Sequence, residues 1–242
     1  MKILVIPDIH THYEKAERIC RKYSDHKIIF LGDYFDTFND TPDDNQFTAD
    51  WLKESLSKPN RIHLRGNHDE QYDPRINVFC SGFSGNKKNA INNVLTVEDW
   101  DKLKYFHFEN TWLFSHAGVN RHWFGNPMDV KINIDALQEK IENGVVLQKS
   151  GNPDNCIWAS DKLRGGKHEF GGILWADWRK LDLIPNLKQC VGHTPLHRIT
   201  TLTDNIINAK NINVDCSAIT YMSEVLQVEE NGNVNILITT HV

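Results

Sequence analysis

Five short segments carry aspartate, asparagine and histidine residues that can bind metal ions or move protons. Asp8 and His10 are two residues apart, so that in an extended turn both side chains reach one cation from the same side. Asp33 and Asp36, which follow Gly32, place two carboxylates three residues apart. Each segment alone has an ordinary explanation, such as a helix cap or a hydrogen-bonded histidine, but five in order predict a metal site. The other three are Gly66-Asn67-His68-Asp69, Ser115-His116-Ala117-Gly118 and Gly192-His193-Thr194-Pro195.

Each of these segments directly follows a short apolar run that predicts a strand buried on both faces. Helices are expected at about Tyr13–Tyr23, Thr48–Leu56 and Val97–Tyr105, which gives the chain a βαβ rhythm. In open α/β sheets the ligand crevice lies at the carboxyl ends of the strands, so the five segments can converge on one place. The five predicted strands are Lys2–Ile6, Lys27–Leu31, Arg61–Leu64, Thr111–Phe114 and Leu187–Val191.

The remaining chain predicts one domain over residues 1–242, with an insertion at about 120–172 that covers the site. The insertion contains an expected helix at Ile134–Asn143 followed by sequence rich in glycine and asparagine. After His193, strand-like runs and a tight Asn231-Gly232 hairpin predict a second, antiparallel-rich sheet layer. The late runs are Ile199–Leu202, Ile212–Val214 and Glu224–Val228.

Composition excludes several classes of function. A formal net charge of −5 leaves no basic face for stable nucleic-acid binding. The five cysteines are odd in number and contain no C-x-x-C pair, which argues against a disulfide framework and favours a reducing compartment. The apolar stretch Ile3–Ile6 is too short for a signal peptide or a membrane span. We therefore expect a cytoplasmic protein that does not bind a membrane.

Taken together, the five segments resemble the calcineurin-like metallophosphoesterase superfamily. Residues 64–68, 115–118 and 192–195 are similar to the phosphoprotein phosphatase branch, including its small bacterial and phage members. The resemblance implies an α/β sandwich of two mainly mixed β-sheets flanked by helices. It also assigns roles: Asp8 and His10 bind a first metal, Asp33 bridges both metals, Asn67, His116 and His193 bind the second, and His68, oriented by Asp36, is the general acid.

The chemistry of these ligands agrees with that assignment. A bridging carboxylate holds two cations about 3.5 to 4 Å apart, where together they acidify a shared water whose hydroxide attacks phosphorus. Oxygen and imidazole ligands without thiolate favour two divalent cations, with manganese expected and iron or zinc as alternatives. We also expect Asp36 to keep His68 protonated at a higher pH than a free imidazole.

One position departs from the phosphoprotein phosphatase pattern. The arginine that follows the Gly-Asp-x-x-Asp run in that branch, where it binds the phosphate, is replaced here by Thr37. Arg179, in Trp175-Ala176-Asp177-Trp178-Arg179, is the first candidate to replace it, and Arg121 and Arg164 are weaker ones. This departure weakens the match to protein phosphatases. The leading hypothesis is still a phosphatase that hydrolyses phosphate monoesters, including those of phosphoproteins.

Two other functions remain open. A nucleotide or dinucleoside polyphosphate hydrolase of the diadenosine tetraphosphatase kind would use the same metal ligands, and Thr37 together with the 120–172 insertion keeps this alternative open. A catalytically inactive binding scaffold is the third hypothesis. It is disfavoured because Asp36, His68 and the complete ligand set are present.

Overall fold

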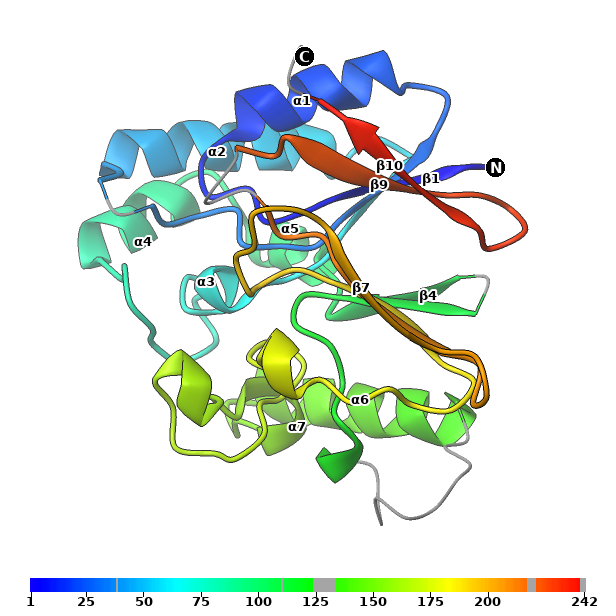
Figure 1. Cartoon of the computed structure of the whole chain (residues 1–242). Helices are drawn as coiled ribbons and strands as arrows, with labels where there is room; N and C mark the ends of the chain where they lie inside the picture. The colour runs from blue at the N-terminus through cyan, green and yellow to red at the C-terminus, as the bar shows by residue number, and fades with distance from the viewer. Residues whose placement is uncertain (38, 110, 124–133, 217–220, 240–242) are drawn as a thin grey trace.

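The computed structural model describes residues 1–37, 39–109, 111–123, 134–216 and 221–239. Within these residues the strands form two five-stranded sheets, in the orders β10-β9-β1-β2-β3 and β4-β5-β6-β8-β7. The sheets stack on each other, with α1 and α2 outside the first sheet and α6 and α7 outside the second (Figure 1). Both sheets mix parallel and antiparallel pairs, which confirms the predicted α/β sandwich.

The elements have the following bounds. The first sheet contains β1 (Ile3–Ile6), β2 (Lys27–Phe30), β3 (Arg61–His63), β9 (Glu224–Val228) and β10 (Val234–Ile238). The second contains β4 (Phe106–Glu109), β5 (Trp112–Ser115), β6 (Lys188–Val191), β7 (Thr200–Asp204) and β8 (Ala209–Asn213). The α-helices are α1 (Tyr13–Lys22), α2 (Pro42–Ser55), α3 (Asn67–Glu70), α4 (Gly85–Asn92), α5 (Val97–Lys102), α6 (Ile134–Lys149) and α7 (Asn155–Trp158), and the 3₁₀ helices are η1 (Arg121–Trp123), η2 (Lys162–Arg164) and η3 (Trp178–Lys180).

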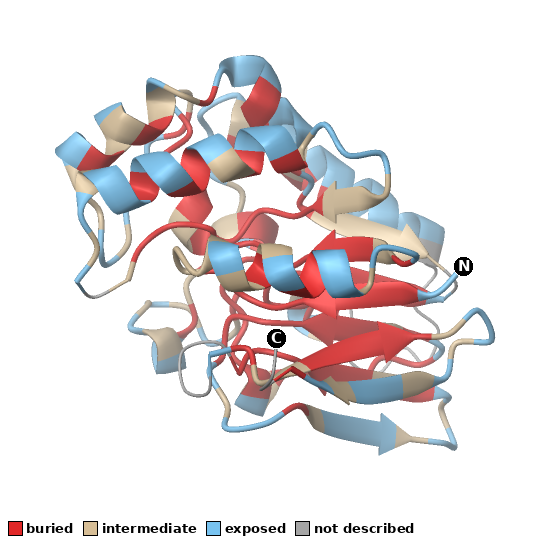
Figure 2. Cartoon of the chain, turned by 90° about the horizontal axis from the view of Figure 1, so that it is seen from above, coloured by how far each residue is buried: buried red, intermediate tan, exposed pale blue. Residues whose placement is uncertain are grey.

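The core follows from the alternation of side chains along buried strands. In β1, Ile3 and Val5 point between the two sheets, whereas Leu4 and Ile6 point toward the helices of the first layer. All four are nearly inaccessible to solvent, and Figure 2 shows the central strands buried along their length. A strand buried on both faces needs apolar residues at every position, which explains the unbroken apolar runs in the sequence.

The structure corrects several predicted elements. Helix α2 begins at Pro42, six residues before the predicted start at Thr48, because Thr41 and Asp44 form a capping box. The C-terminal third is not one layer: β7 and β8 join the second sheet, but β9 pairs antiparallel with β1 in the first. This pairing covers the edge of β1 that faces away from β2, so the first sheet is completed by the end of the chain.

Other differences concern short or polar elements. The helix expected at Ile134–Asn143 continues to Lys149, with Leu137 and Ile141 buried. Strand β4 and helices α3, α4 and α7 were not predicted. The hairpin at Asn231-Gly232 is confirmed by the pairing of Val228 with Val234. Residues 124–133 of the predicted insertion lie outside the described residues. Among the residues that are described, no helix is both long and apolar enough to cross a bilayer.

Candidate metal centre

The site is positioned by the carboxyl ends of five strands. β1, β2 and β3 run parallel in the first sheet, and β5 runs parallel to β6 in the second. Parallel strands end at the same edge, so the turns that follow them come together. The site residues follow these strands in turn: Asp8 and His10 after β1, Asp33 and Asp36 after β2, Asn67 and His68 after β3, His116 after β5 and His193 after β6.

Hydrogen bonds across the sandwich join the two sheets at this edge. His116, after β5, bonds through Nδ1 to the carbonyl oxygen of Leu31, after β2, at 2.9 Å. The backbone N–H of His193, after β6, donates to both carboxylate oxygens of Asp8, after β1, at 3.1 and 3.2 Å. The ligands from the two sheets are therefore held in a fixed relation to each other.

Six predicted ligands come together in two groups that share one residue. Asp8, His10 and Asp33 have ligand atoms within 4.8 Å of one another, and so do Asp33, His116 and His193. Asp33 Oδ2 lies 3.7 Å from His10 Nε2 and 3.4 Å from His116 Nε2. Asp33 is thus placed between the groups, as a bridging carboxylate would be. Asn67 Oδ1 lies 2.9 Å from His116 Nε2, which adds the amide oxygen to the second group.

The hydrogen-bond acceptor atoms that converge at the site are suited to bind cations. A carbonyl oxygen only accepts, so the bond to Leu31 places the proton of neutral His116 on Nδ1 and leaves an acceptor lone pair on Nε2. That Nε2 faces the amide oxygen of Asn67 and, at 3.1 Å, Nδ1 of His193. His10 is oriented in the same way, because its Nδ1 donates to the carbonyl oxygen of Asp36 at 2.7 Å. Converging acceptors of this kind are satisfied by a metal ion.

The pKa shifts of the buried side chains also indicate that the site suits cations. Burial, with the nearby charges of Asp215 and Asp33, raises the pKa of Asp8 well above its ordinary value. Burial and the charge of Asp69 likewise raise the pKa of Asp33, and burial lowers the pKa of His116 to about 3. A cluster that disfavours ionised carboxylates and charged imidazoles is compensated by divalent cations. The sequence analysis gave Asp215 no role, because Asp215 does not belong to any of the five predicted segments.

Strained backbone marks the same turns. His10, Asp33, Asp36 and His193 all have positive φ angles, of 42°, 50°, 66° and 66°. Non-glycine residues adopt this conformation rarely and at a cost of order 1–3 kcal/mol each, and such residues concentrate at functional sites. The turns are held by Asp69, whose carboxylate accepts the backbone N–H groups of Asp33, Tyr34 and Gly66 at 2.7 to 2.8 Å.

Close approach explains the glycine before Asn67. A Cβ atom on Gly66 would lie 2.0 Å from Asp33 Oδ1. No side chain larger than hydrogen therefore fits beside the shared carboxylate.

The proposed acid pair lies beside the first group of ligands. His68 Nδ1 is 3.1 Å from Asp36 Oδ2, and the His68 ring lies edge to face with His10, with ring centroids 5.4 Å apart. Asp36 does raise the pKa of His68, but the expectation that His68 stays protonated at a higher pH than a free imidazole is wrong in this structure. Burial is the largest effect and, together with the charges of His10 and Lys87, it outweighs Asp36 and lowers the pKa of His68.

The three candidate arginines differ in their partners. Arg179 bonds through Nε and Nη2 to the carboxylate of Asp177, at 2.8 Å each, and its side chain is 60% exposed. Arg121 donates to the carbonyl oxygen of Leu183 at 2.7 Å. Arg164, in η2, is half-buried and donates through Nη2 to the carbonyl oxygen of His193 at 3.1 Å. Arg164, from a segment of the 120–172 insertion, therefore contacts a predicted metal ligand.

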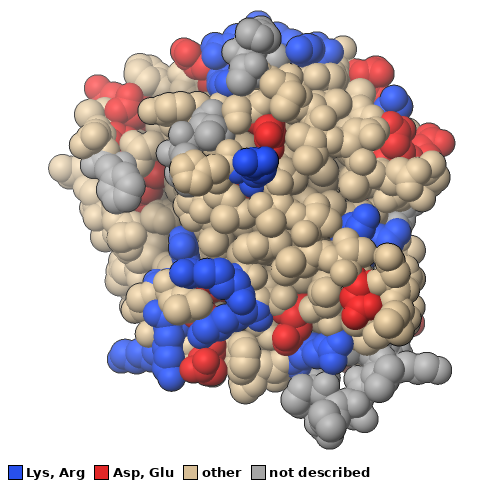
Figure 3. Space-filling model, in the orientation of Figure 1, with Lys and Arg blue, Asp and Glu red and all other residues tan. Residues whose placement is uncertain are grey.

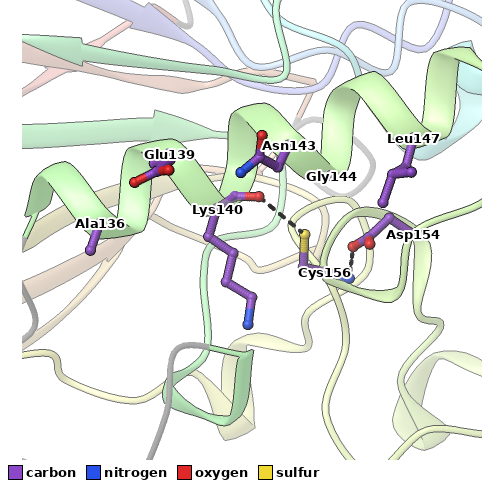
Figure 4. Close-up of a pocket in the computed structure, with 8 residues that line it drawn as sticks. All are labelled: Ala136, Glu139, Lys140, Asn143, Gly144, Leu147, Asp154 and Cys156. Atoms are coloured by element: carbon purple, nitrogen blue, oxygen red, sulfur yellow. Dashed lines mark hydrogen bonds between the residues drawn. The ribbon is translucent and has the colours of Figure 1, made fainter.

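Two surface hollows lie outside the ligand cluster. One, of about 360 Å³, is formed between α6 and the start of α7 (Figure 4). Its Asp154 accepts the backbone N–H of Cys156 at 2.8 Å, and Cys156 Sγ contacts the carbonyl oxygen of Lys140, so these polar groups serve packing. The other, of about 370 Å³, begins at Thr11 and His12, directly after His10, and includes Tyr13, Lys15, Arg18 and Tyr221.

The two-sheet sandwich and the paired ligand groups define a class of protein, the phosphoesterases with a two-metal centre. The chain belongs to the calcineurin-like phosphoesterase family, whose model matches residues 1–197. It is accordingly a metallophosphoesterase, a hydrolase that acts on phosphoric ester bonds. No curated protein sequence matches the chain.

Solved structures share the fold at low sequence identity. A cold-active protein-tyrosine phosphatase from a psychrophilic Shewanella has 17% identity and a TM-score of 0.61, with 98% of this chain and 78% of that chain covered. A protein serine/threonine phosphatase from Saccharomyces cerevisiae has 15% identity and a TM-score of 0.51 over 98% and 79%. A proposed diadenosine tetraphosphatase has 12% identity and a TM-score of 0.51 over 100% and 95%.

Proposed function

We propose that this phosphoesterase hydrolyses phosphate monoesters, including those of phosphoproteins, with Asp8, His10, Asp33, Asn67, His116 and His193 holding two divalent cations. The observation that carries the proposal is the pair of ligand groups that share Asp33, beside the His68–Asp36 pair. The cations, for which manganese is proposed with iron or zinc as alternatives, supply the Lewis acidity that polarises phosphoryl oxygens and acidifies water. None of the five cysteines, all of which lie in the described residues, forms a disulfide, which agrees with a reducing, cytoplasmic location.

The proton for the leaving group comes from His68. Its Nδ1 is engaged by Asp36, so Nε2 is the nitrogen available to protonate the ester oxygen as the bond to phosphorus breaks. The edge-to-face contact with His10 places the His68 ring beside the first ligand group. Asp36 serves to hold the tautomer and orientation of the imidazole, as the carboxylate does in other acid–base pairs.

Arg164 is our first candidate for the arginine that binds the substrate phosphate, and Arg179 remains the second. Arg164 contacts His193 and is partly exposed, whereas the guanidinium of Arg179 is held by Asp177. Lys and Arg side chains gather over the segment around η2, at the lower left of the face in Figure 3. Positive charge beside an otherwise acidic centre supports an anionic substrate.

The hollow beside His12 keeps a nucleotide or dinucleoside polyphosphate as the second candidate substrate. Its wall offers two tyrosines, Tyr13 and Tyr221, and two cations, Lys15 and Arg18. Such a combination suits a base and additional phosphates of a leaving group. The same wall also contains Glu14 and Asp44, so its charge is balanced. We therefore keep phosphate monoesters as the leading proposal.

A substrate panel tests the proposal. The panel compares a phosphopeptide, p-nitrophenyl phosphate, its bis ester and a dinucleoside polyphosphate with Mn²⁺, on the wild type beside a His68→Asn variant that detects a contaminating phosphatase. We expect kcat/KM to be highest for the monoesters and to fall in the variant. A preference for the polyphosphate by orders of magnitude would support the second candidate and overturn the first.

A further inference from the structure

The carboxylate of Asp36 receives more donors than its pairing with His68 requires. On Oδ2 it accepts Nδ1 of His68 at 3.1 Å and Nε2 of Gln71 at 2.6 Å. On Oδ1 it accepts the hydroxyl of Tyr72 at 2.6 Å and Nζ of Lys87 at 3.0 Å. Both oxygens are thus fixed from two directions, so the carboxylate has one orientation in which all four donors are satisfied.

Lys87 is the one charged donor in that set other than the imidazole itself, and it is buried. The residue is 8% exposed, on the first turn of α4, where its Nζ also donates to Asp40 Oδ1 at 2.8 Å and to the carbonyl oxygen of Gly82 at 3.1 Å. A buried lysine is costly unless its charge is paired, and here all three protons have acceptors. Lys87 lies on the same face of α4 as the buried Ile91, four residues later, so its side chain points toward the core.

We propose that Lys87 is a positioning residue for the general acid, which it serves by fixing the carboxylate of Asp36 that orients His68. The inference rests on the proposed phosphomonoesterase function. Without Lys87, the Oδ1 side of Asp36 keeps only the Tyr72 hydroxyl, and a buried negative charge loses its ion pair. The carboxylate then turns toward its remaining donors, and the hydrogen bond that aligns His68 weakens.

The dependence of rate on the leaving group separates this role from a structural one. A good leaving group such as 2,4-dinitrophenolate departs without protonation, whereas phenolate needs the acid. For Lys87→Met we expect kcat/KM for phenyl phosphate to fall roughly tenfold to a hundredfold, as for other partners that orient a catalytic group. With 2,4-dinitrophenyl phosphate the loss should stay within about threefold, because His68 contributes little to that reaction.

Neighbouring substitutions provide matched controls. Lys88, the next residue of α4, donates to the carbonyl oxygens of Gln71 and Asp73 and not to the carboxylate of Asp36. Lys88→Met should therefore leave the leaving-group dependence unchanged. Lys87→Arg should restore most of the phenyl phosphate rate, because it keeps the charge. Lys87→Gln keeps a donor without the charge and serves in place of the methionine variant if that variant does not fold.

Two further measurements exclude indirect effects. The backbone carbonyl of Asp36 also bonds to His10, so Mn²⁺ affinity is measured by calorimetry and should be the same in Lys87→Met as in the wild type. In a His68→Asn background the Lys87 substitution should change kcat/KM for phenyl phosphate by less than about twofold, because Lys87 acts through His68 and that side chain is absent.

An equal loss for both aryl phosphates, additive losses with His68→Asn, or weakened Mn²⁺ binding would each overturn the role of Lys87. The proposed function fails in a different way, namely if the wild type hydrolyses neither aryl phosphate or if His68→Asn has no effect on either.

Discussion

The proposed metal centre differs in construction from the proposed substrate-facing rim, which consists of Arg164 and the residues around His12. The ligands Asp8, Asp33, Asn67, His116 and His193 are 4% exposed or less and come from turns at the ends of buried strands. The rim candidates, Arg164 and the residues around His12, come from a 3₁₀ helix and from the partly exposed start of α1. On the proposed function, the buried scaffold would fix the reaction and the surface segments would select the substrate.

The Lys87–Asp36–His68 chain lies between these two regions. Asp36 belongs to the strand-end turn, but Lys87 belongs to α4, outside the sheets. Changes in the cluster should therefore remove activity on every substrate, changes in this chain should depend on the leaving group, and changes at the rim should depend on the substrate.

The largest effect is expected at the shared ligand. Asp33→Asn keeps the shape but removes the charge between the two groups, so we expect kcat/KM to fall on the order of a thousandfold or more for every ester, because the cations supply several kcal/mol of stabilisation. Metal content should also fall, measured by mass spectrometry of the purified protein. Asp50→Asn on the exposed face of α2 is the control. Retained metal and activity would refute the bridging role.

The next effect concerns His68. His68→Asn should lower kcat/KM for phenyl phosphate roughly a hundredfold or more, the usual size of the loss of a general acid. Steady-state assays over a series of aryl phosphates measure the loss, which should shrink as the leaving group improves. A uniform loss across the series would show that His68 binds metal or substrate and does not protonate the leaving oxygen.

A smaller effect tests the rim. Arg164→Ala should raise KM and lower kcat/KM roughly tenfold to a hundredfold, as expected when one donor to a phosphoryl oxygen is removed. Arg179→Ala, measured in parallel on the same ester, should change kcat/KM by less than about threefold, because its guanidinium is held by Asp177. A larger loss of kcat/KM in Arg179→Ala than in Arg164→Ala would indicate that Arg179 binds the phosphate.

The smallest effect concerns stability away from the cluster. Although burial alone would raise it, hydrogen bonds from Arg75 and the charge of Arg65 lower the pKa of Asp73 to about 2. This depressed pKa contributes about 2 kcal/mol of stability above pH 4, which is lost as the pH falls toward 2. The difference in urea unfolding between wild type and Asp73→Asn should therefore be largest at pH 5 and should shrink as the pH is lowered toward 2. A difference that does not change with pH would contradict the ion-pair explanation.

Much of the site was predictable because it depends on local sequence. Asp33 and His116 each follow an unbroken apolar run, and that combination predicts both a buried strand and a polar turn at its end. The ends of parallel strands then meet without any long-range information. The same reasoning places His193, although it lies 185 residues from Asp8, whose carboxylate accepts its backbone N–H.

The rest depends on contacts that sequence distance conceals. Lys87 lies in a largely polar helix, and its pairing with Asp36, 51 residues earlier, exists only in the folded chain. The sequence favoured Arg179, in the segment Trp175–Arg179, over Arg164 as the arginine that binds the phosphate. The structure, however, places Arg164 of η2 in contact with His193. The placement of β9 beside β1 likewise depends on which sheet edge is open once the first strands have paired.

Anomalous diffraction from crystals grown with Mn²⁺ tests the central claim most directly. We expect two manganese ions about 3.5 to 4 Å apart, both bound by the carboxylate of Asp33. Asp8 and His10 should bind one ion, and Asn67, His116 and His193 the other. A single ion, or two ions with Asn67 or His193 far from both, would contradict the proposed centre.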